Sequence, residues 1–264
     1  MENLKQNSEP TQRTYYLRGM GVLCLVALLF LAGLWRFGET TLPVSSKLGN
    51  KALPICSVDT DKKQVALSFD AAWSNEGTDK ILEILARYGL KVTFFVTGEW
   101  VDVYPEEVKK ITAAGHDLGN HSENHKHMKE LSNDQCRQEI LQVSEKVKAL
   151  TGVQMELFRA PYGEFDSQII HHSSACGYYP IRWSVDSLDW KDYGERSIVK
   201  TVIGHENLSA GAIIRCNSGT KYTADALEEV ITGLQEQGYE IVPVSELIRK
   251  DNYWIDQSGK QRAD

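Results

Sequence analysis

Short apolar segments alternate with amphipathic segments along most of this chain, and this alternation constrains the fold more than any other feature. Between Val58 and Leu247, runs typical of buried strands are separated by stretches in which apolar residues recur every three or four positions. The expected strands are residues 65–69, 91–96, 117–120, 156–160, 178–185, 212–216 and 239–244. Strands that alternate with helices pair in parallel through right-handed crossovers. The pattern therefore predicts an α/β domain, either a barrel or a doubly wound sheet.

The expected helices carry recognisable start and stop signals. The first ends at Gly89, a residue that readily adopts the left-handed conformation found after many helices. The second begins at Pro105, which suits a first helical position because proline lacks the N–H that is unpaired there. A long third helix is expected to be capped by Asn133. A fourth occupies residues 223–238.

The N-terminal region has the composition of a membrane anchor. A basic stretch, residues 1–18, precedes an uncharged apolar run, residues 19–35, which is at the short end of what crosses a bilayer. The run is apolar on all sides and has arginines at both ends, which argues against the alternative of a buried core helix. No convincing cleavage site follows it. We expect an uncleaved signal anchor in the cell membrane, single-pass, with the rest of the chain extracytoplasmic.

Three further segments complete the expected organisation. Residues 36–57 are polar, contain two prolines and show no periodicity, so they are expected to form a linker. Residues 58–248 form the folded domain, and residues 249–264 a polar, loosely ordered tail. The formal net charge is −7, which argues against nucleic acid as a partner.

Two histidines four residues apart form the first candidate site. His121 and His125 directly follow the expected strand 117–120. If this segment turns helically, both imidazoles project from one face and can bind a single metal ion. Histidines also occur at this spacing by chance. The neighbouring His116 and His127 are interpreted as packing or surface residues.

Other polar residues also follow expected strands. Asp70 follows strand 65–69, Arg159 ends another strand, and Asp186 and Asp189 come after 178–185. A carboxylate at such a place is usually a turn-former or a helix cap. However, the carboxyl ends of parallel strands meet at one edge, where α/β folds place their sites. These side chains are therefore expected to lie together.

Four of these segments resemble, in the same order, motifs of the polysaccharide deacetylase (NodB-homology, carbohydrate esterase) family. They are SFDAAW (68–73), HSENH (121–125), RAPYG (159–163) and VDSLDW (185–190). The resemblance covers about residues 58–248, and the FDAAW form of the first motif is similar to sporulation-type or clostridial members. It implies a distorted (β/α) barrel. It also implies a metal-dependent hydrolase of non-peptide carbon–nitrogen bonds, which removes acetyl groups from N-acetylated sugars with a divalent ion, usually zinc.

The resemblance assigns catalytic roles to four residues at matching positions. His121 and His125 would bind the metal ion. Asp70 would be the general base for a metal-bound water molecule, whose acidity the ion raises. Arg159 would hold Asp70 in place through a charge-assisted hydrogen bond.

The same resemblance assigns three supporting roles. The backbone N–H of Tyr162 would stabilise the tetrahedral oxyanion. Trp183 would line the pocket for the acetyl methyl group. Asp189 would orient a histidine that protonates the leaving amine.

Three positions depart from the family pattern. Ala71 stands where the family usually has an aspartate as third metal ligand, so the divalent ion is expected to be weakly held. Asn217 replaces the general-acid histidine, and it cannot deliver a proton to an amine at neutral pH. Arg215 replaces an apolar pocket residue and is expected to pair with Asp189 or Asp70.

Two functions remain open from the sequence. The first is a cell-wall polysaccharide N-deacetylase of the peptidoglycan type, acting on the acetamido C–N bond, with His127, Glu123 or solvent completing the metal shell. The second is a catalytically impaired pseudoenzyme that binds wall glycan or a protein partner in the deacetylase cleft. In that case Arg215 would attract a carboxylate such as the lactyl group of muramic acid. Wall glycan is the expected ligand in both.

Overall fold

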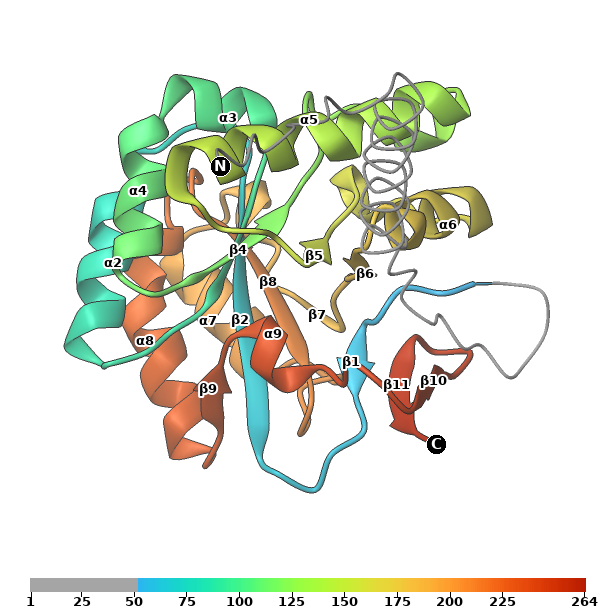
Figure 1. Cartoon of the computed structure of the whole chain (residues 1–264). Helices are drawn as coiled ribbons and strands as arrows, with labels where there is room; N and C mark the ends of the chain where they lie inside the picture. The colour runs from blue at the N-terminus through green and yellow to red at the C-terminus, as the bar shows by residue number, and fades with distance from the viewer. Residues whose placement is uncertain (1–51) are drawn as a thin grey trace, which may run out of the picture. The chain divides into compact units, whose positions relative to one another are not determined.

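The centre of the domain is an open barrel of parallel strands, seen in a computed structural model that describes residues 52–264 (Figure 1). The strands are β2 (Gln64–Ala71), β3 (Thr93–Val96), β4 (Asp117–Asn120), β5 (Leu157–Phe158), β6 (Tyr179–Pro180), β7 (Val185–Asp186), β8 (Ile213–Asn217) and β9 (Glu240–Val242). Their order is β6-β5-β4-β3-β2-β8-β7, and β9 pairs with β2. The predicted α/β fold is confirmed as a half-barrel of parallel strands.

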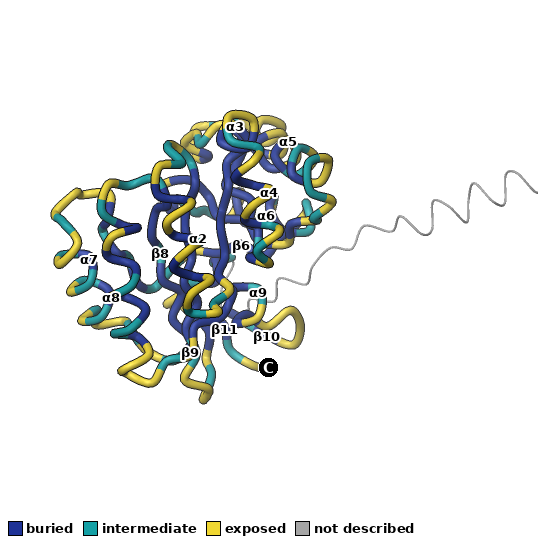
Figure 2. Tube along the Cα trace, turned by 90° about the vertical axis from the view of Figure 1, so that its left-hand side faces the viewer, coloured by how far each residue is buried: buried dark blue, intermediate teal, exposed yellow. Residues whose placement is uncertain are grey.

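Helices cover the outside of this barrel. They are α2 (Thr78–Arg87), α3 (Gly98–Val103), α4 (Pro105–Ala113), α5 (Asn133–Thr151), α6 (Ser167–Ala175), α7 (Glu195–Ile203), α8 (Thr223–Glu236) and α9 (Val244–Leu247). Three short 3-10 turns are η1 (Met128–Glu130), η2 (Pro161–Gly163) and η3 (Asp189–Lys191). Figure 2 shows the strands buried and the outward sides of the helices exposed, as the amphipathic patterns predict.

The cap of α5 differs from the expectation by one residue. Ser132, not Asn133, is the N-cap: its hydroxyl accepts a hydrogen bond from the backbone N–H of Gln135. The side chain of Gln135 accepts in return from the backbone N–H of Ser132. This reciprocal capping box pairs two N–H groups at the helix start, which a cap at Asn133 would not achieve.

The single strand expected at residues 178–185 is two short strands at opposite edges of the sheet. β6 pairs with β5, whereas β7 pairs with β8. Residues 181–184 run between these edges, and Trp183 lies in this crossing segment. The chain before β2 bridges the gap, because Ile55 pairs with Ile181 and Ser57 pairs with Ala212.

The C-terminal residues form a small second sheet rather than a loose tail. β1 (Ser57–Val58), β10 (Tyr253–Ile255) and β11 (Lys260–Ala263) pair in the order β1-β11-β10. Tyr253 and Ile255 are buried. The side chain of Gln261, also buried, bonds to the backbone N–H and carbonyl of Arg249 at 2.7 Å each. The expectation of loose order for residues 249–264 is therefore wrong, because alternating apolar residues there bury against the domain.

The expected anchor at residues 19–35 lies outside the described residues, as do residues 1–18 and most of the expected linker. Residues 52–57 of that linker are described, and Ile55 among them is fully buried. Within residues 52–264, no helix has the length and apolar composition needed to cross a membrane.

Candidate active site

The carboxyl ends of the central strands bring the predicted polar side chains to one edge of the barrel. Asp70 lies near the end of β2, and strand pairing places it directly beside Asn217 at the end of β8. The next pairing along places Asp186 of β7 beside Arg215 of β8. Because parallel neighbours end together, these strand ends supply one polar cluster.

Arg159 lies against Asp70 at the centre of this cluster. Its Nη1 donates to Asp70 Oδ1 at 2.7 Å, and its Nη2 donates to Ser68 Oγ at 2.9 Å. The guanidinium has no exposed surface and lies 3.9 Å from the ring centroid of Phe95. This charge is therefore fixed by hydrogen bonds on one side and by an aromatic face on the other.

Arg215 contacts the other oxygen of the same carboxylate. Its Nε donates to Asp70 Oδ2 at 2.7 Å, and its Nη2 donates to Asn217 Oδ1 at 3.0 Å. Of the two expected partners, Asp70 is bonded to it, and Asp189 is not. Asp186 is a partner that the sequence did not reveal, with 3.4 Å between its Oδ2 and Nη1 of Arg215. Only the β7–β8 register brings these two side chains together.

The two arginines determine the charge state of Asp70. Burial alone would raise the pKa of this carboxyl, but Arg159, His121 and Arg215 together hold it well below its ordinary value. Asp70 in turn raises the pKa of Arg215 despite the burial of that guanidinium. Asp70 is therefore ionised at neutral pH, and the same low pKa makes it a weak proton acceptor.

The histidine pair is close together but not on a helix. Ser122 and His125 have positive φ angles of 68° and 52°, which a helix does not contain. The two rings nevertheless lie 4.9 Å apart, centroid to centroid. Nδ1 of His121 lies 2.7 Å from the Arg159 carbonyl oxygen, so Nε2 is the nitrogen that lies 3.8 Å from Asp70 Oδ2. The segment does not make the helical turn that was considered for it, but the two rings still lie together.

Burial keeps both imidazoles neutral. It lowers the pKa of His121, and together with the neighbouring His121 it lowers the pKa of His125 to about 3. The ring of His125 also packs between Trp73, at 5.0 Å, and Tyr162, at 4.7 Å. Neutral imidazole is the form that binds a metal ion.

The residues present do not complete a metal site of the family type. Ala71 is buried and offers only a methyl group. Glu123, one expected substitute, is paired with Lys146. His127, the other, has its Nδ1 2.9 Å from Glu164 Oε1. Across residues 52–264, no group of three or more histidine, cysteine, aspartate or glutamate side chains could hold an ion. The chain supplies two imidazoles where three protein ligands are usual.

The backbone of Tyr162 is in the left-handed region and, within residues 52–264, its N–H is free to donate a hydrogen bond. Its φ is 58°, and its N–H has no acceptor within the described part of the chain. The next residue, Gly163, lies so close to Trp183 that an added Cβ would be 2.6 Å from the indole. Glycine is therefore required there, because a side chain would clash with the indole.

Asp189 holds Asn217 in place. Its two oxygens accept from the backbone N–H and the side-chain amide of Asn217, both at 2.6 Å. Thr223 at the start of α8 also donates to Asp189, at 2.6 Å. Thr223 was missed as a site residue because a threonine at a helix start is typical of a helix boundary. The residue that Asp189 orients is an amide, which cannot act as an acid.

Comparisons with known proteins identify the family of the chain. Residues 57–181 match the family model for polysaccharide deacetylase. The chain is 33% identical over 193 residues to the peptidoglycan-N-acetylmuramic acid deacetylase PdaA of Bacillus subtilis, covering 72% of this chain and 73% of that protein. It is 37% identical over 194 residues to an uncharacterised 30.6 kDa protein of Geobacillus stearothermophilus, with 72% of each covered.

Among solved structures, a protein of Bacillus anthracis described as a CE4 family pseudoenzyme has a TM-score of 0.71. It is 32% identical, with 80% of this chain and 73% of that chain covered. A mutant of that protein, described as having restored enzymatic activity, also has a TM-score of 0.71 at 34% identity, covering 75% and 71%. With this likeness in sequence and in structure, the chain belongs to the polysaccharide deacetylase family.

Proposed function

We propose that this chain is a hydrolase of the peptidoglycan N-deacetylase type, which acts on the acetamido C–N bond of N-acetylated sugars in wall glycan. One observation carries the proposal: the ionised Asp70, fixed by Arg159, lies 3.8 Å from Nε2 of a neutral imidazole, His121. The deacetylase activity of the PdaA relative supports the same reaction class.

The reaction requires a base, an oxyanion donor and an acid. Water adds to the acetyl carbon, the C–N bond breaks, and acetate and a free amine form once the nitrogen has taken a proton. In this proposal Asp70 accepts the proton of the attacking water, and the Tyr162 N–H donates to the oxyanion. A divalent ion, zinc by its affinity for imidazole, would be weakly held by His121 and His125, because Ala71 adds no ligand.

Turnover is expected to be slow for two reasons. Asn217 cannot protonate the leaving amine, and general acid catalysis is worth about 10²–10⁴-fold. Arg215 bonds to Asp70 Oδ2 and lowers its basicity. Arg215 and Asn217 both lie at the end of β8, beside Asp70 on the neighbouring strand.

The Arg215–Asp70 hydrogen bond also supports a second candidate, a pseudoenzyme that binds glycan or a protein partner without cleaving it. Arg215 is a cation bonded to Asp70, so it stabilises the negative charge of this carboxylate, as a bound metal ion would in other family members. The structural likeness to a CE4 family pseudoenzyme is consistent with this candidate.

The place of action is proposed from sequence alone. The basic residues 1–18 and the apolar run 19–35 support a single-pass anchor in the cell membrane, with the domain extracytoplasmic. This location would put the domain next to wall glycan.

Acetate release by the full-length chain tests the proposal. The substrates are N-acetylated chito-oligosaccharides and peptidoglycan, and the control is a His121→Gln, His125→Gln variant that keeps the buried arginines paired. We expect slow release that the control lacks. Glycan binding without release would favour the second candidate, and absence of both binding and release would reject both.

A further inference from the structure

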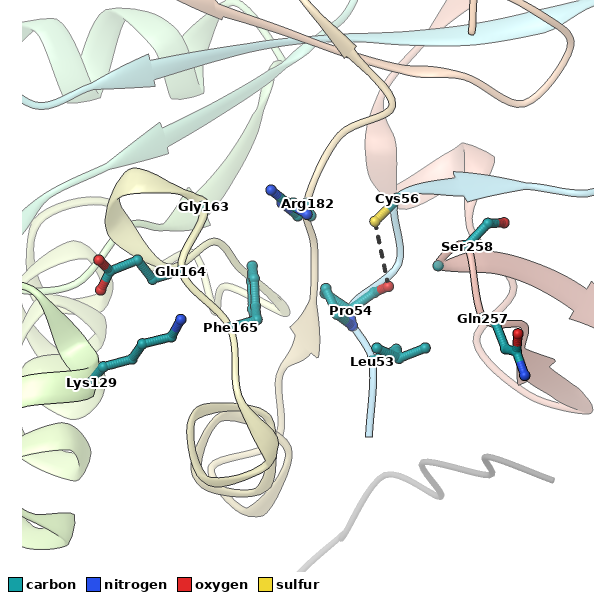
Figure 3. Close-up of a pocket in the computed structure, with 11 residues that line it drawn as sticks. Leu53, Pro54, Cys56, Lys129, Gly163, Glu164, Phe165, Arg182, Gln257 and Ser258 are labelled. Carbon is teal, nitrogen blue, oxygen red and sulfur yellow. Dashed lines mark hydrogen bonds between the residues drawn. The ribbon is translucent and has the colours of Figure 1, made fainter. Parts of the chain in front are cut away.

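A cavity of about 370 Å³ adjoins the active site and has no assigned role (Figure 3). Its lining comes from four parts of the chain: η1, the segment 163–165 at the end of RAPYG, the crossing segment between β6 and β7, and the region where the chain before β1 meets the loop between β10 and β11. The principal lining residues are Pro54, Lys129, Gly163, Phe165, Arg182 and Ser258. The small sheet that replaces the expected loose tail thus builds one wall of this cavity.

Trp183 connects the cavity to the active site. Arg215 lies over its ring at 4.7 Å on the active-site side, and Arg182, which lines the cavity, lies 5.7 Å from the same centroid. Gly163 also lines the cavity, and an added Cβ there would meet both Trp183 and Nε of Arg182. When one sugar of a glycan lies beside Trp183, a substituent on that sugar or on the next one can therefore reach the cavity.

The cavity lining carries a net positive charge, because Arg182 and Lys129 outweigh the single carboxylate of Glu164. Arg182 and Lys129 are exposed, and neither side chain has a hydrogen bond or ion pair with the described residues. The one carboxylate in the lining, Glu164, has its Oε1 on His127 instead. Burial raises the pKa of the Cys56 thiol to about 11, so this group adds no negative charge. Two unpaired cations thus share one hollow in a chain of net charge −7.

Arg215 is less suited to bind an anion than the sequence suggested. Each of its nitrogens already donates a hydrogen bond, to Asp70, Asp186 and Asn217. A carboxylate ligand would share this guanidinium with two carboxylates of the protein, which repel it. Arg182 and Lys129 have no such partners to lose.

We propose that this cavity is a subsite for a carboxylate carried by the wall glycan, next to the N-acetylated sugar at the active site. A guanidinium can bind both carboxylate oxygens at once, and the lysine adds a second charge. Phe165 and Pro54 offer apolar surface for the carbon atoms that bear the carboxylate. The inference rests on the proposed function, and it assigns the substrate class to acidic rather than neutral N-acetylated glycans.

Two sources of this carboxylate are chemically equivalent at the subsite. One is the lactyl ether of a muramic acid residue, and the other is a peptide attached to it. The probes are therefore chito-tetraose, which is neutral, a peptide-free tetrasaccharide of alternating N-acetylglucosamine and N-acetylmuramic acid, and the same tetrasaccharide bearing its peptides. Dissociation constants are measured by calorimetry with the full-length chain.

Two matched double variants separate the subsite from overall charge. Arg182→Gln with Lys129→Gln removes the cavity cations. Arg196→Gln with Lys200→Gln removes one arginine and one lysine from the exposed face of α7, far from any proposed role. All four side chains are on the surface, so both variants are expected to fold, which a thermal melt confirms.

The native chain is expected to bind an acidic tetrasaccharide about tenfold or more tightly than chito-tetraose. The cavity variant should lose this preference and keep its affinity for chito-tetraose, whereas the α7 variant should keep both. Preference for the peptide-free acidic glycan identifies the lactyl carboxylate, and preference for the peptide-bearing form alone identifies the peptide. Equal binding of acidic and neutral glycans, or a preference that survives in the cavity variant, overturns the inference and leaves the proposed function standing. Failure to bind any of the three overturns both.

Discussion

Replacing Asp70 with asparagine removes the carboxylate that two buried arginines share. Asp70 is 3% exposed, and it bonds to Arg159 and Arg215 at 2.7 Å through separate oxygens. The introduced asparagine could accept through one oxygen only, and its NH₂ group would face a guanidinium that has no acceptor to offer. The Asp70→Asn variant therefore places two cations together without a counter-charge between them.

The cost follows from the burial of each partner. Breaking a buried ion pair typically costs about 3–5 kcal/mol, because the remaining charge is left uncompensated. Arg159 has no exposed surface and keeps only Ser68 and the Arg182 carbonyl oxygen. The side chain of Arg215 is 15% exposed and keeps Asp186, so part of its charge is still compensated. We expect a loss of about 3 kcal/mol in the free energy of unfolding, the lower end of that range.

Urea denaturation at pH 7 measures this loss, and a double-mutant cycle identifies its cause. Arg215→Leu in the Asp70→Asn background removes one of the stranded cations, so it should recover about 1–2 kcal/mol. In the native background the same Arg215→Leu change should be destabilising. A loss below about 1 kcal/mol for Asp70→Asn, or a gain in stability, would refute the view that these charges are coupled as the distances indicate.

Two further predictions concern other residues. Ala71→Asp should tighten zinc binding by at least about tenfold, because it adds a third protein ligand beside His121 and His125. Competition with a chromophoric chelator measures the Kd for zinc. An unchanged Kd would contradict the view that these three positions face one ion. His116 is buried, and burial followed by the charge of Lys91 lowers its pKa to about 4, from an ordinary value of 6.5. Between these two pKa values the unfolded chain binds the proton more readily than the folded chain. The free energy of unfolding should therefore fall by about 2 kcal/mol between pH 7 and pH 5 because of this residue. Urea denaturation at the two pH values should show that a His116→Gln variant lacks this part of the loss.

The sequence predicted those parts of the fold that follow from local periodicity. The strands around Asp70 and Val96 and the helix after Ser132 occupy nearly their expected places, because each has a clear apolar pattern. The split of residues 178–185 into β6 and β7 was not predictable, because the break depends on which strands the two halves pair with. Pairing is a tertiary property that a continuous apolar run does not encode.

In the candidate site, too, the sequence predicted the residues of the motifs but not the contacts that depend on tertiary structure. The motifs identified Asp70, His121 and Arg159, and the structure brings all three together. The pairing of Asp186 with Arg215 was not predicted, because it depends on strand register. Thr223 was not identified, because its contact with Asp189 depends on the approach of α8 to η3. The unpaired cations of the neighbouring cavity could not be recognised either, since a lysine or arginine without a partner is defined only by what surrounds it.

Three positions, Ala71, Arg215 and Asn217, are expected to limit the turnover of this deacetylase. We would compare acetate release from N-acetylated glycan by the native full-length chain and by an Ala71→Asp, Arg215→Leu, Asn217→His variant. Asp189 already bonds to Asn217, so a histidine at that position would meet an orienting carboxylate. We expect slow release by the native chain and release at least about 10²-fold faster by the variant. A folded, zinc-binding variant that releases acetate no faster than the native chain would contradict this expectation.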